Sequence, residues 1–376
     1  MAANIDTLDM SLYVDWGPNW ADLFEELEKG KLAAQGTGAA TFRGGETIIL
    51  STGGKKFYSW HLQRTEFHLF LTRSPEPSSK TPNVSVSFSA RTLWEIGPFA
   101  AFQMIVDWIN QLGGSVHKSH ISRLEVAADF VVVGEISHEF IKQHLVTRCE
   151  HKTFYEAGDV TETVYVGAPG AIQMLRIYDK TRELAKSPTK TWLREIWGDI
   201  GLETVYRVEF QLRREALRAY GINALEDLDK VAGLWICLTR NWVSIRNLDN
   251  DNTTRRSTHP FWEKVQAAGK KFGSMQDVMR RKFVSLPDLQ RNLAGAMGYV
   301  KTYAGLMSLE GTFKEVVLSF VKTAMERGLD QSFQEEVRVR RIKLGVPLRN
   351  NSESDSPVPK IPGEEDVPRS SGNKAA

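Results

Sequence analysis

The pattern of hydrophobic and polar residues predicts strands and helices that alternate through most of the chain. Alternation with a period of two, as in Phe67, Leu69 and Leu71, is typical of a strand with one buried face. Apolar residues three or four apart, as in Phe102, Ile105 and Ile109, are typical of a helix. The predicted strands are 46–51, 56–74, 83–89, 121–133, 162–167, 172–183 and 204–213, and the predicted helices are 20–32, 98–112, 137–145, 215–220 and 224–242.

Strands and helices interleaved in this way predict an α+β fold, with antiparallel sheets that carry helices on one face. The segments 46–133 and 153–242 each have a β-α-β-like order, which suggests two halves of similar construction. Beyond Pro260 the pattern is helical to about Leu344. We therefore expect an α+β region at 1–250, a mainly helical extension at 251–349 and a disordered tail at 350–376, where Ser, Pro, Gly and charged residues dominate.

Composition narrows the class of protein. The 376 residues are 41% hydrophobic and 25% charged, which excludes a mostly disordered chain and an arginine-rich arm binder. Two cysteines are too few for a disulfide framework or a cysteine zinc site. The longest apolar run, 231–238, is far shorter than the roughly 20 residues that cross a bilayer. With no secretory signal at the start of the chain, we expect a soluble protein in the cytoplasm of a bacterial host and no membrane partner.

The net charge of +2 hides an uneven distribution of charge. Residues 1–60 hold eight acidic and five basic residues, and residues 350–376 hold five acidic and three basic residues. The segment between them therefore carries +7. A moderately basic middle fits a polyanionic partner such as DNA, and it also fits ordinary solubility.

Three of the predicted strands place charged residues on one face. Because successive side chains of a strand point to opposite faces, every second residue shares a face. These residues are Arg123, Glu125 and Asp129 in one strand, Arg176, Tyr178 and Lys180 in another, and Arg207, Glu209, Gln211 and Arg213 in the third. If the strands are neighbours, carboxylates that suit Mg²⁺ or Mn²⁺ lie beside a tyrosine and several cations. The solvated face of an ordinary sheet carries the same residue types.

Tyr178 is the candidate nucleophile of this face. A phenolate can attack a phosphodiester when a metal and cations stabilise the developing charge. Lys180 and Arg176 could neutralise phosphate oxygens or solvate the sheet edge, and Tyr178 could equally be a half-buried strand residue without a chemical role. A transesterification through tyrosine conserves the phosphodiester energy, so such a reaction needs no nucleotide cofactor. The sequence contains no G-x-x-x-x-G-K-[ST] loop, so we expect no helicase activity within this chain.

Several short motifs occur in a defined order. They are RLEVAADF at 123–130, YVG at 165–167, RIYDKTRE at 176–183, YRVEFQLR at 206–213, and DNTTRR at 251–256 followed by PFW at 260–262. In order and spacing they resemble the replication initiation factor family, the Rep-trans rolling-circle replication initiators of plasmids and filamentous phages. The resemblance covers residues 10–265 approximately.

The resemblance implies metal-dependent nicking and joining of DNA by the α+β region. Tyr178 would form a 5′-phosphotyrosyl link and leave a free 3′-OH, with Lys180 and Arg176 beside it. Mg²⁺ or Mn²⁺ would bind Glu125, Asp129 and Glu209. The first of these acidic positions is usually Asp in the family, so Glu125 is a departure that leaves the metal geometry open. Related nickases use a His-hydrophobic-His metal motif, which the HKSH run at 117–120 does not match, and we expect these two histidines in a loop.

The implied partners are single-stranded or supercoiled origin DNA, a host helicase and polymerase, and a second copy of the chain. A conjugative relaxase with the same chemistry, a DNA-binding regulator that does not nick, and a nuclease that uses water are alternatives. Basic clusters at 270–271, 280–282 and 338–343 could contact phosphates or form solvated helix faces. Four tryptophans could stack on bases, although each is by itself more typical of a core: Trp60, Trp94, Trp192 and Trp262.

Overall fold

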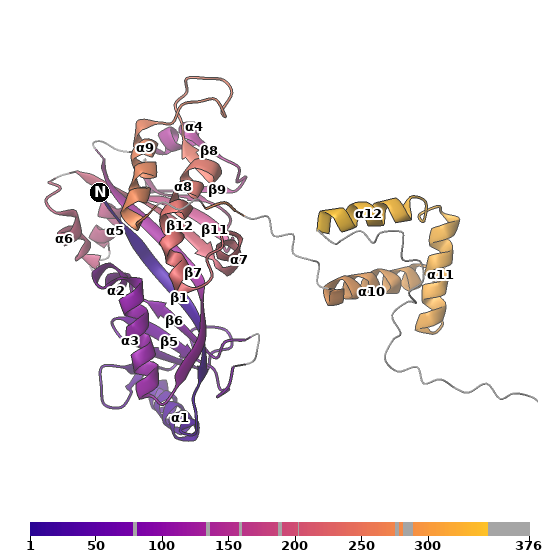
Figure 1. The fold of residues 1–376 in the computed structure, drawn as a ribbon, viewed down its shortest axis with the longest axis horizontal. Coiled ribbons are helices and arrows are strands. Elements are labelled where there is room, and N and C mark those ends of the chain that lie inside the picture. Colours follow the sequence, from indigo (N-terminus) through magenta and orange to yellow (C-terminus); the bar gives the residue numbers. More distant parts are fainter. Residues whose placement is uncertain are drawn as a thin grey trace, which may run out of the picture. The chain divides into compact units, whose positions relative to one another are not determined.

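The chain divides into two compact units, Met1–Arg281 and Lys282–Ala376 (Figure 1). The structure is a computed structural model that describes residues 1–77, 81–132, 136–157, 160–186, 190–201, 203–274, 278–280 and 289–344. Residues 251–274, which the sequence assigned to the helical extension, belong to the first unit. The predicted disordered tail at 350–376 lies outside the described residues.

The first unit is built on one antiparallel sheet, in which the described residues form eleven strands. In order across the sheet these are β2 (Ala39–Thr41), β3 (Ile48–Leu50), β4 (Trp60–Gln63), β5 (Phe67–Leu71), β6 (Val84–Phe88), β1 (Ala2–Asp15), β7 (Ser115–Val132), β12 (Thr204–Arg213), β11 (Gln173–Asp179), β10 (Val160–Val166) and β9 (Lys152–Ala157). A separate pair joins β8 (Leu145–Thr147) to β13 (Val243–Ile245). The predicted α+β class with antiparallel strands is confirmed, and the two predicted halves share a single sheet.

Strand β1, which was not predicted from the sequence, lies at the centre of the sheet between β6 and β7, and the two predicted halves meet where β7 pairs with β12. It pairs with β7 from Ala2 opposite Asp129 to Asp15 opposite Ser115, and with β6 on its other side. The register shifts between Ile5 and Thr7, so Asp6 is an extra residue in a β-bulge. Because each bulge changes which residues share a face, β1 loses the regular alternation by which a strand is recognised.

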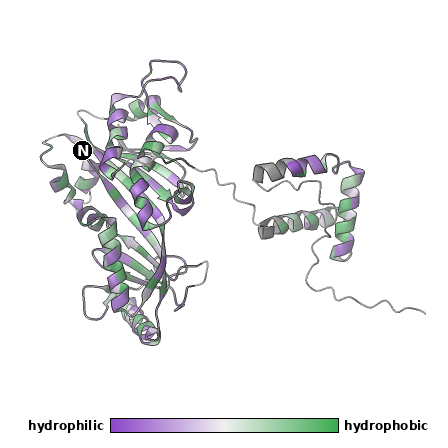
Figure 2. Cartoon of the chain, in the orientation of Figure 1, coloured by the Kyte–Doolittle hydropathy of each residue, from purple (hydrophilic) through white to green (hydrophobic). Residues whose placement is uncertain are grey.

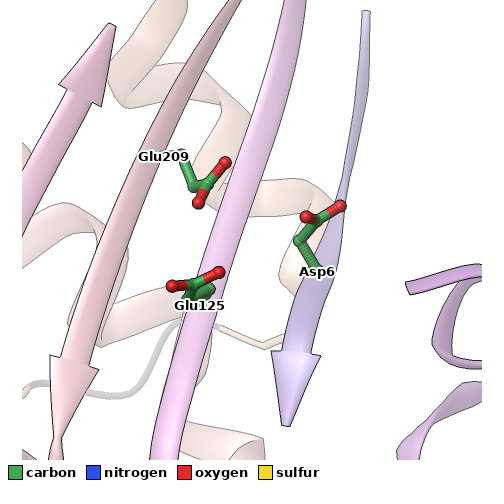
Figure 3. Close-up of side chains that lie close together, drawn as sticks. All are labelled: Asp6, Glu125 and Glu209. Carbon is green, nitrogen blue, oxygen red and sulfur yellow. The ribbon is translucent and has the colours of Figure 1, made fainter. Parts of the chain in front are cut away.

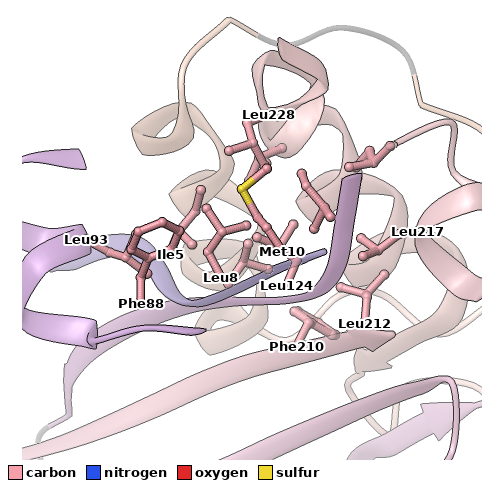
Figure 4. Close-up of a cluster of buried hydrophobic side chains, with 14 of the residues drawn as sticks. Ile5, Leu8, Met10, Phe88, Leu93, Leu124, Phe210, Leu212, Leu217 and Leu228 are labelled. Carbon is pink, nitrogen blue, oxygen red and sulfur yellow. The ribbon is translucent and has the colours of Figure 1, made fainter. Parts of the chain in front are cut away.

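The core lies between one face of the sheet and the helices that cover it. Figure 4 shows Leu8 and Met10 of β1 beside Leu124 of β7 and Phe210 of β12, and all four are fully buried. Covering residues come from α2 (Ala90–Glu95), α7 (Arg214–Ala219) and the 3-10 helix η2 (Leu225–Lys230). The remaining helices of this unit are α1 (Trp20–Thr37), α3 (Gly97–Gln111), α4 (His138–His144), α5 (Lys180–Lys186), α6 (Leu193–Trp197), α8 (Val231–Cys237), η3 (Leu238–Trp242), α9 (Pro260–Ala267) and η4 (Ala268–Phe272).

Several predicted elements have different bounds in the structure. The predicted strand 56–74 is two strands, β4 and β5, and the predicted helix 224–242 is divided among η2, α8 and η3. The predicted strand 172–183 ends at Asp179, where α5 begins. His117 and His120 lie within β7 and not in a loop, because this strand starts at Ser115. Polar residues fill this end of β7, so apolar alternation could not reveal it.

The tryptophans differ in their exposure. Trp60 and Trp262 are fully buried in the core, so they are not available to stack on bases. Trp94 and Trp192 are half-buried and meet edge to face, with ring centroids 6.0 Å apart.

The second unit is helical, as predicted. Its helices are α10 (Leu289–Leu306), α11 (Phe313–Glu326) and α12 (Phe333–Leu344), and Figure 2 shows both hydrophobic and hydrophilic residues along α11. The Tyr303 hydroxyl of α10 lies 2.8 Å from the Thr323 hydroxyl and 3.0 Å from the Ser319 hydroxyl of α11, which joins the two helices. Among the described residues, no helix has the length and apolar character needed to cross a membrane.

The basic clusters are only partly described. Lys270 and Lys271 are exposed in η4 of the first unit. Residues 281–282 lie outside the described part, as do the side chains from 339 onwards.

A pair of histidines, His61 buried and His68 half-buried, predicts that the first unit loses stability in acid. His61 Nε2 lies 2.9 Å from His68 Nδ1, and the His61 ring stacks on Phe70. Burial, together with His68 and Lys55, lowers the pKa of His61 from 6.5 to about 4. As the pH falls from about 6.5 to about 4, the unfolded chain therefore gains a proton here before the folded chain does. This contribution to stability is present above pH 6.5 and is lost through that window.

The replacement His61→Gln should make the free energy of unfolding, measured with urea, fall less steeply between pH 7 and pH 4.5. The replacement His117→Gln is the control, because His117 is exposed. Equal slopes for wild type and His61→Gln would contradict the prediction.

Candidate active site

The three strands that carry the predicted site residues are neighbours in the order β7-β12-β11. Arg207 of β12 lies opposite Asp129 of β7 and opposite Tyr178 of β11, and Glu209 lies opposite Arg176. Residues directly opposite each other point to the same face of a sheet. The side chains of these strands therefore meet on the face away from the core, which we call the polar face: Arg123, Glu125, Asp129, Arg176, Tyr178, Arg207 and Glu209.

Three buried carboxylates gather at the centre of the polar face. Asp6, Glu125 and Glu209 each offer an oxygen atom, and these atoms lie within 4.8 Å of one another. Figure 3 shows the three side chains projecting from β1, β7 and β12 on the same side of the sheet. We call these three residues the carboxylate cluster. Glu125 and Glu209 were predicted from the sequence, whereas Asp6 was not, because it is the bulged residue of the unpredicted strand β1.

Cations and hydroxyl groups hold the two glutamates of the cluster in place. Arg176 Nη2 bonds Glu209 Oε1 and lies 3.0 Å from Glu125 Oε1. Arg123 also bonds Glu125 Oε1, and the Thr7 hydroxyl donates to Glu125 Oε2 at 2.8 Å. Both glutamates therefore already share Arg176 as a counter-charge.

Asp129, the third predicted metal ligand, lies beside the cluster with other partners. Arg207 Nε donates to its Oδ1 at 2.6 Å, and Arg207 Nη2 and Trp197 Nε1 donate to its Oδ2 at 2.9 and 2.8 Å. Arg207 Nη1 donates to Asp6 Oδ1 at 2.8 Å. The fully buried Arg207 thus links Asp129 to the cluster, and Asp6 supplies the third clustered oxygen.

Tyr178 stands at the edge of the carboxylate cluster. Its hydroxyl donates to Glu209 Oε2 at 3.0 Å, and Lys180 Nζ lies 3.4 Å from the same hydroxyl. Burial, reinforced by Glu209, raises the pKa of Tyr178 well above its ordinary value, whereas burial and Arg207 lower the pKa of Lys180. Tyr178, Lys180 and Arg176 are therefore brought together with Glu209, as the sequence predicts.

A cavity of about 270 Å³ opens beside Tyr178. Its lining combines three cationic, three hydroxyl-bearing and two acidic side chains: Arg176, Arg182, Lys186, Thr163, Tyr165, Tyr178, Asp179 and Glu183. Arg182 and Lys186 were not among the predicted site residues. Their signal is the spacing of four in RIYDKTRELAK, which places both on one face of α5 once the strand ends at Asp179.

No protein-family model and no curated protein matches the chain. Among solved structures, the chain is similar to the rolling-circle replication initiator protein from Geobacillus stearothermophilus. The two are 17% identical, the match covers 74% of this chain and 98% of the other, and the TM-score is 0.45. A likeness this distant assigns no role to any residue.

The donor set of the cluster fits a hard divalent cation. Its three members offer carboxylate oxygens, the ligands that Mg²⁺ and Mn²⁺ prefer, and include no histidine or cysteine, which zinc and copper favour. Burial raises the pKa of Glu209 to about 7, although Arg176 opposes the rise. Burial alone would raise the pKa of Asp6, but Arg207, Lys190 and Lys180 together lower it below its ordinary value. Buried carboxylates so close together need cations to remain ionised, and a bound metal would supply one.

Proposed function

We propose that this chain is a rolling-circle replication initiator that nicks and rejoins one strand of origin DNA through Tyr178. The observation that carries the proposal is the position of the Tyr178 hydroxyl. It donates to Glu209 of a three-carboxylate cluster and lines a cavity to which Arg176, Arg182 and Lys186 contribute cations. The order of the sequence motifs supports the replication role, and the site supports the chemistry.

Cleavage is a transesterification at phosphorus. Tyr178 Oη attacks the phosphodiester, the Oη–P bond forms and the P–O3′ bond breaks. Glu209 Oε2 already accepts the tyrosine hydrogen bond, so it is positioned to take the phenolic proton, and the departing 3′ oxygen takes up a proton. The products are a 5′-phosphotyrosyl link and a 3′-OH that can prime synthesis. Rejoining is the reverse reaction and needs no nucleotide cofactor.

The cations of the site have separate tasks. Lys180, 3.4 Å from Tyr178 Oη, stabilises the phenolate as it forms. Arg182 and Lys186 line the cavity, where they bind the phosphates next to the scissile bond. A divalent ion held by Asp6, Glu125 and Glu209 would supply Lewis-acid stabilisation of the phosphoryl oxygens.

Other classes of DNA protein give different results in one assay, which treats supercoiled and single-stranded DNA with the protein and Mn²⁺ or EDTA. The proposed function predicts nicks and a covalent protein–DNA adduct with Mn²⁺ and neither with EDTA. Cleavage without an adduct would indicate a nuclease that uses water, and binding without cleavage would indicate a regulator. A conjugative relaxase would give the same adduct and is distinguished by its origin.

The replacement Glu209→Gln is expected to weaken Mn²⁺ binding about 100-fold or more, because it removes one charged ligand from a buried site. Electron paramagnetic resonance of free Mn²⁺ measures the affinity. Glu183→Gln is the matched control, since Glu183 lines the cavity but lies outside the carboxylate cluster, and it should bind Mn²⁺ as wild type does. If wild type and Glu209→Gln bind Mn²⁺ with equal affinity, Glu209 is not a ligand of the metal.

A further inference from the structure

Arg176 and Arg207 both bridge carboxylates of the polar face, but their bonding differs. Arg207 is fully buried and uses Nε, Nη1 and Nη2 to bond Asp6 and Asp129. Arg176 contacts Glu209 and Glu125 through one atom, Nη2. Its Nε is buried and has no hydrogen-bond partner. An arginine that serves a permanent ion pair uses its planar fork, as Arg207 does. Arg176 does not bond its carboxylates through the fork in this way, because its Nε has no hydrogen-bond partner.

Arg176 lies between two sites. On one side are the oxygens of Glu125 and Glu209, which belong to the carboxylate cluster. On the other side is the cavity beside Tyr178, which Arg176 lines together with Arg182 and Lys186. Its side chain is 25% exposed, whereas those of Glu125 and Glu209 are 4% and 2% exposed. The guanidinium can therefore turn towards the cavity while the glutamates stay in place.

We propose that Arg176 is a displaceable counter-cation, which neutralises Glu125 and Glu209 until a divalent metal binds them and then turns to a DNA phosphate in the cavity. This inference rests on the metal site of the proposed function. A guanidinium and a divalent cation beside the same two glutamates repel each other and compete for the same oxygens. A phosphate in the cavity offers Arg176 the bidentate partner that it lacks.

This exchange couples metal binding to DNA binding. DNA that captures Arg176 frees the glutamates for the metal, and metal that displaces Arg176 frees it for DNA. Because such coupling is reciprocal, each ligand raises the affinity of the other by the same factor. The device would keep the buried glutamates paired when neither ligand is present.

Direct Mn²⁺ binding to Arg176→Gln tests the inference without any measure of cleavage. Without DNA, the variant is expected to bind Mn²⁺ about tenfold more tightly than wild type, because the competing cation is gone. Single-stranded oligothymidine should tighten Mn²⁺ binding about tenfold in wild type, after correction for Mn²⁺ bound to the DNA itself, and leave Arg176→Gln unchanged. The control is Arg182→Gln. Arg182 lines the same cavity, but the ion pairs of Glu125 and Glu209 with the cavity cations are made by Arg176, so without DNA this variant should bind Mn²⁺ as wild type does.

The outcomes separate this inference from the proposed function. If wild type binds Mn²⁺ and Arg176→Gln binds it equally or more weakly, Arg176 is not a competitor and the inference is wrong, while the metal site stands. If neither binds Mn²⁺, both the metal site and the inference fail. Arg176→Lys, which retains a positive charge, is the control for a folding defect. Its affinity for Mn²⁺ should lie between those of wild type and Arg176→Gln, and its circular dichroism spectrum should be unchanged.

Discussion

Replacing Tyr178 by Phe is expected to reduce strand cleavage and rejoining about 10⁴-fold or more, because it removes the nucleophile itself. The substitution deletes only the hydroxyl that donates to Glu209 and lies near Lys180. The ring keeps its place on β11, with Lys180 Nζ 5.3 Å from its centroid. DNA binding and the circular dichroism spectrum should therefore remain close to those of wild type. Single-turnover cleavage of a DNA substrate that wild type cuts measures the effect.

Tyr165→Phe is the matched control for this experiment. Tyr165 lies on the neighbouring strand β10, directly opposite Arg176, and lines the same cavity. Among the described residues, the hydroxyls that bond the carboxylate cluster are those of Thr7 and Tyr178, so Tyr165→Phe should cleave within about tenfold of wild type. If Tyr178→Phe cleaves at the wild-type rate, or if Tyr165→Phe loses more cleavage activity than Tyr178→Phe does, Tyr178 is not the nucleophile.

Replacing Arg207 by Met is expected to lower the free energy of unfolding of the first unit by about 3–5 kcal/mol. Arg207 is fully buried and bonds the buried carboxylates Asp6 and Asp129. Methionine fills much of the same volume, so the loss comes mainly from two carboxylates that no longer have a cation. Chemical denaturation monitored by tryptophan fluorescence measures the change.

A surface ion pair provides the comparison. Arg43 pairs with Glu26, and their side chains are 45% and 34% exposed. Solvent screens this pair, so Arg43→Ala should cost about 1 kcal/mol or less. A loss in Arg207→Met no larger than the loss in Arg43→Ala would show that Arg207 does not hold Asp6 and Asp129 together.

The grouping of Glu125, Glu209, Arg176 and Tyr178 could be predicted because it depends on local rules. Strand alternation places each side chain on a face, and the antiparallel order of β7, β12 and β11 then brings the faces together. The helices of the second unit could also be predicted from the sequence, because apolar residues recur there at helical spacing.

Asp6 could not be found in the same way. It reaches the cluster through a bulge in β1, and β1 pairs with a strand more than a hundred residues further along the chain. Neither the register shift nor this distant pairing leaves a local pattern. For Asp129, alternation gave the correct face, but it does not reveal which partner lies opposite, and here that partner is Arg207.

The most direct test of the proposed chemistry is to identify the amino acid that becomes linked to DNA. The full chain is incubated with a randomised single-stranded DNA library and a supercoiled plasmid library in the presence of Mn²⁺. Covalent adducts are then digested with protease and nuclease, and the modified peptide is sequenced by mass spectrometry. We predict a nucleotide on Tyr178, in the peptide that contains RIYDK, and no adduct when EDTA replaces Mn²⁺. A nucleotide on any other residue, or cleavage without an adduct, would contradict the account.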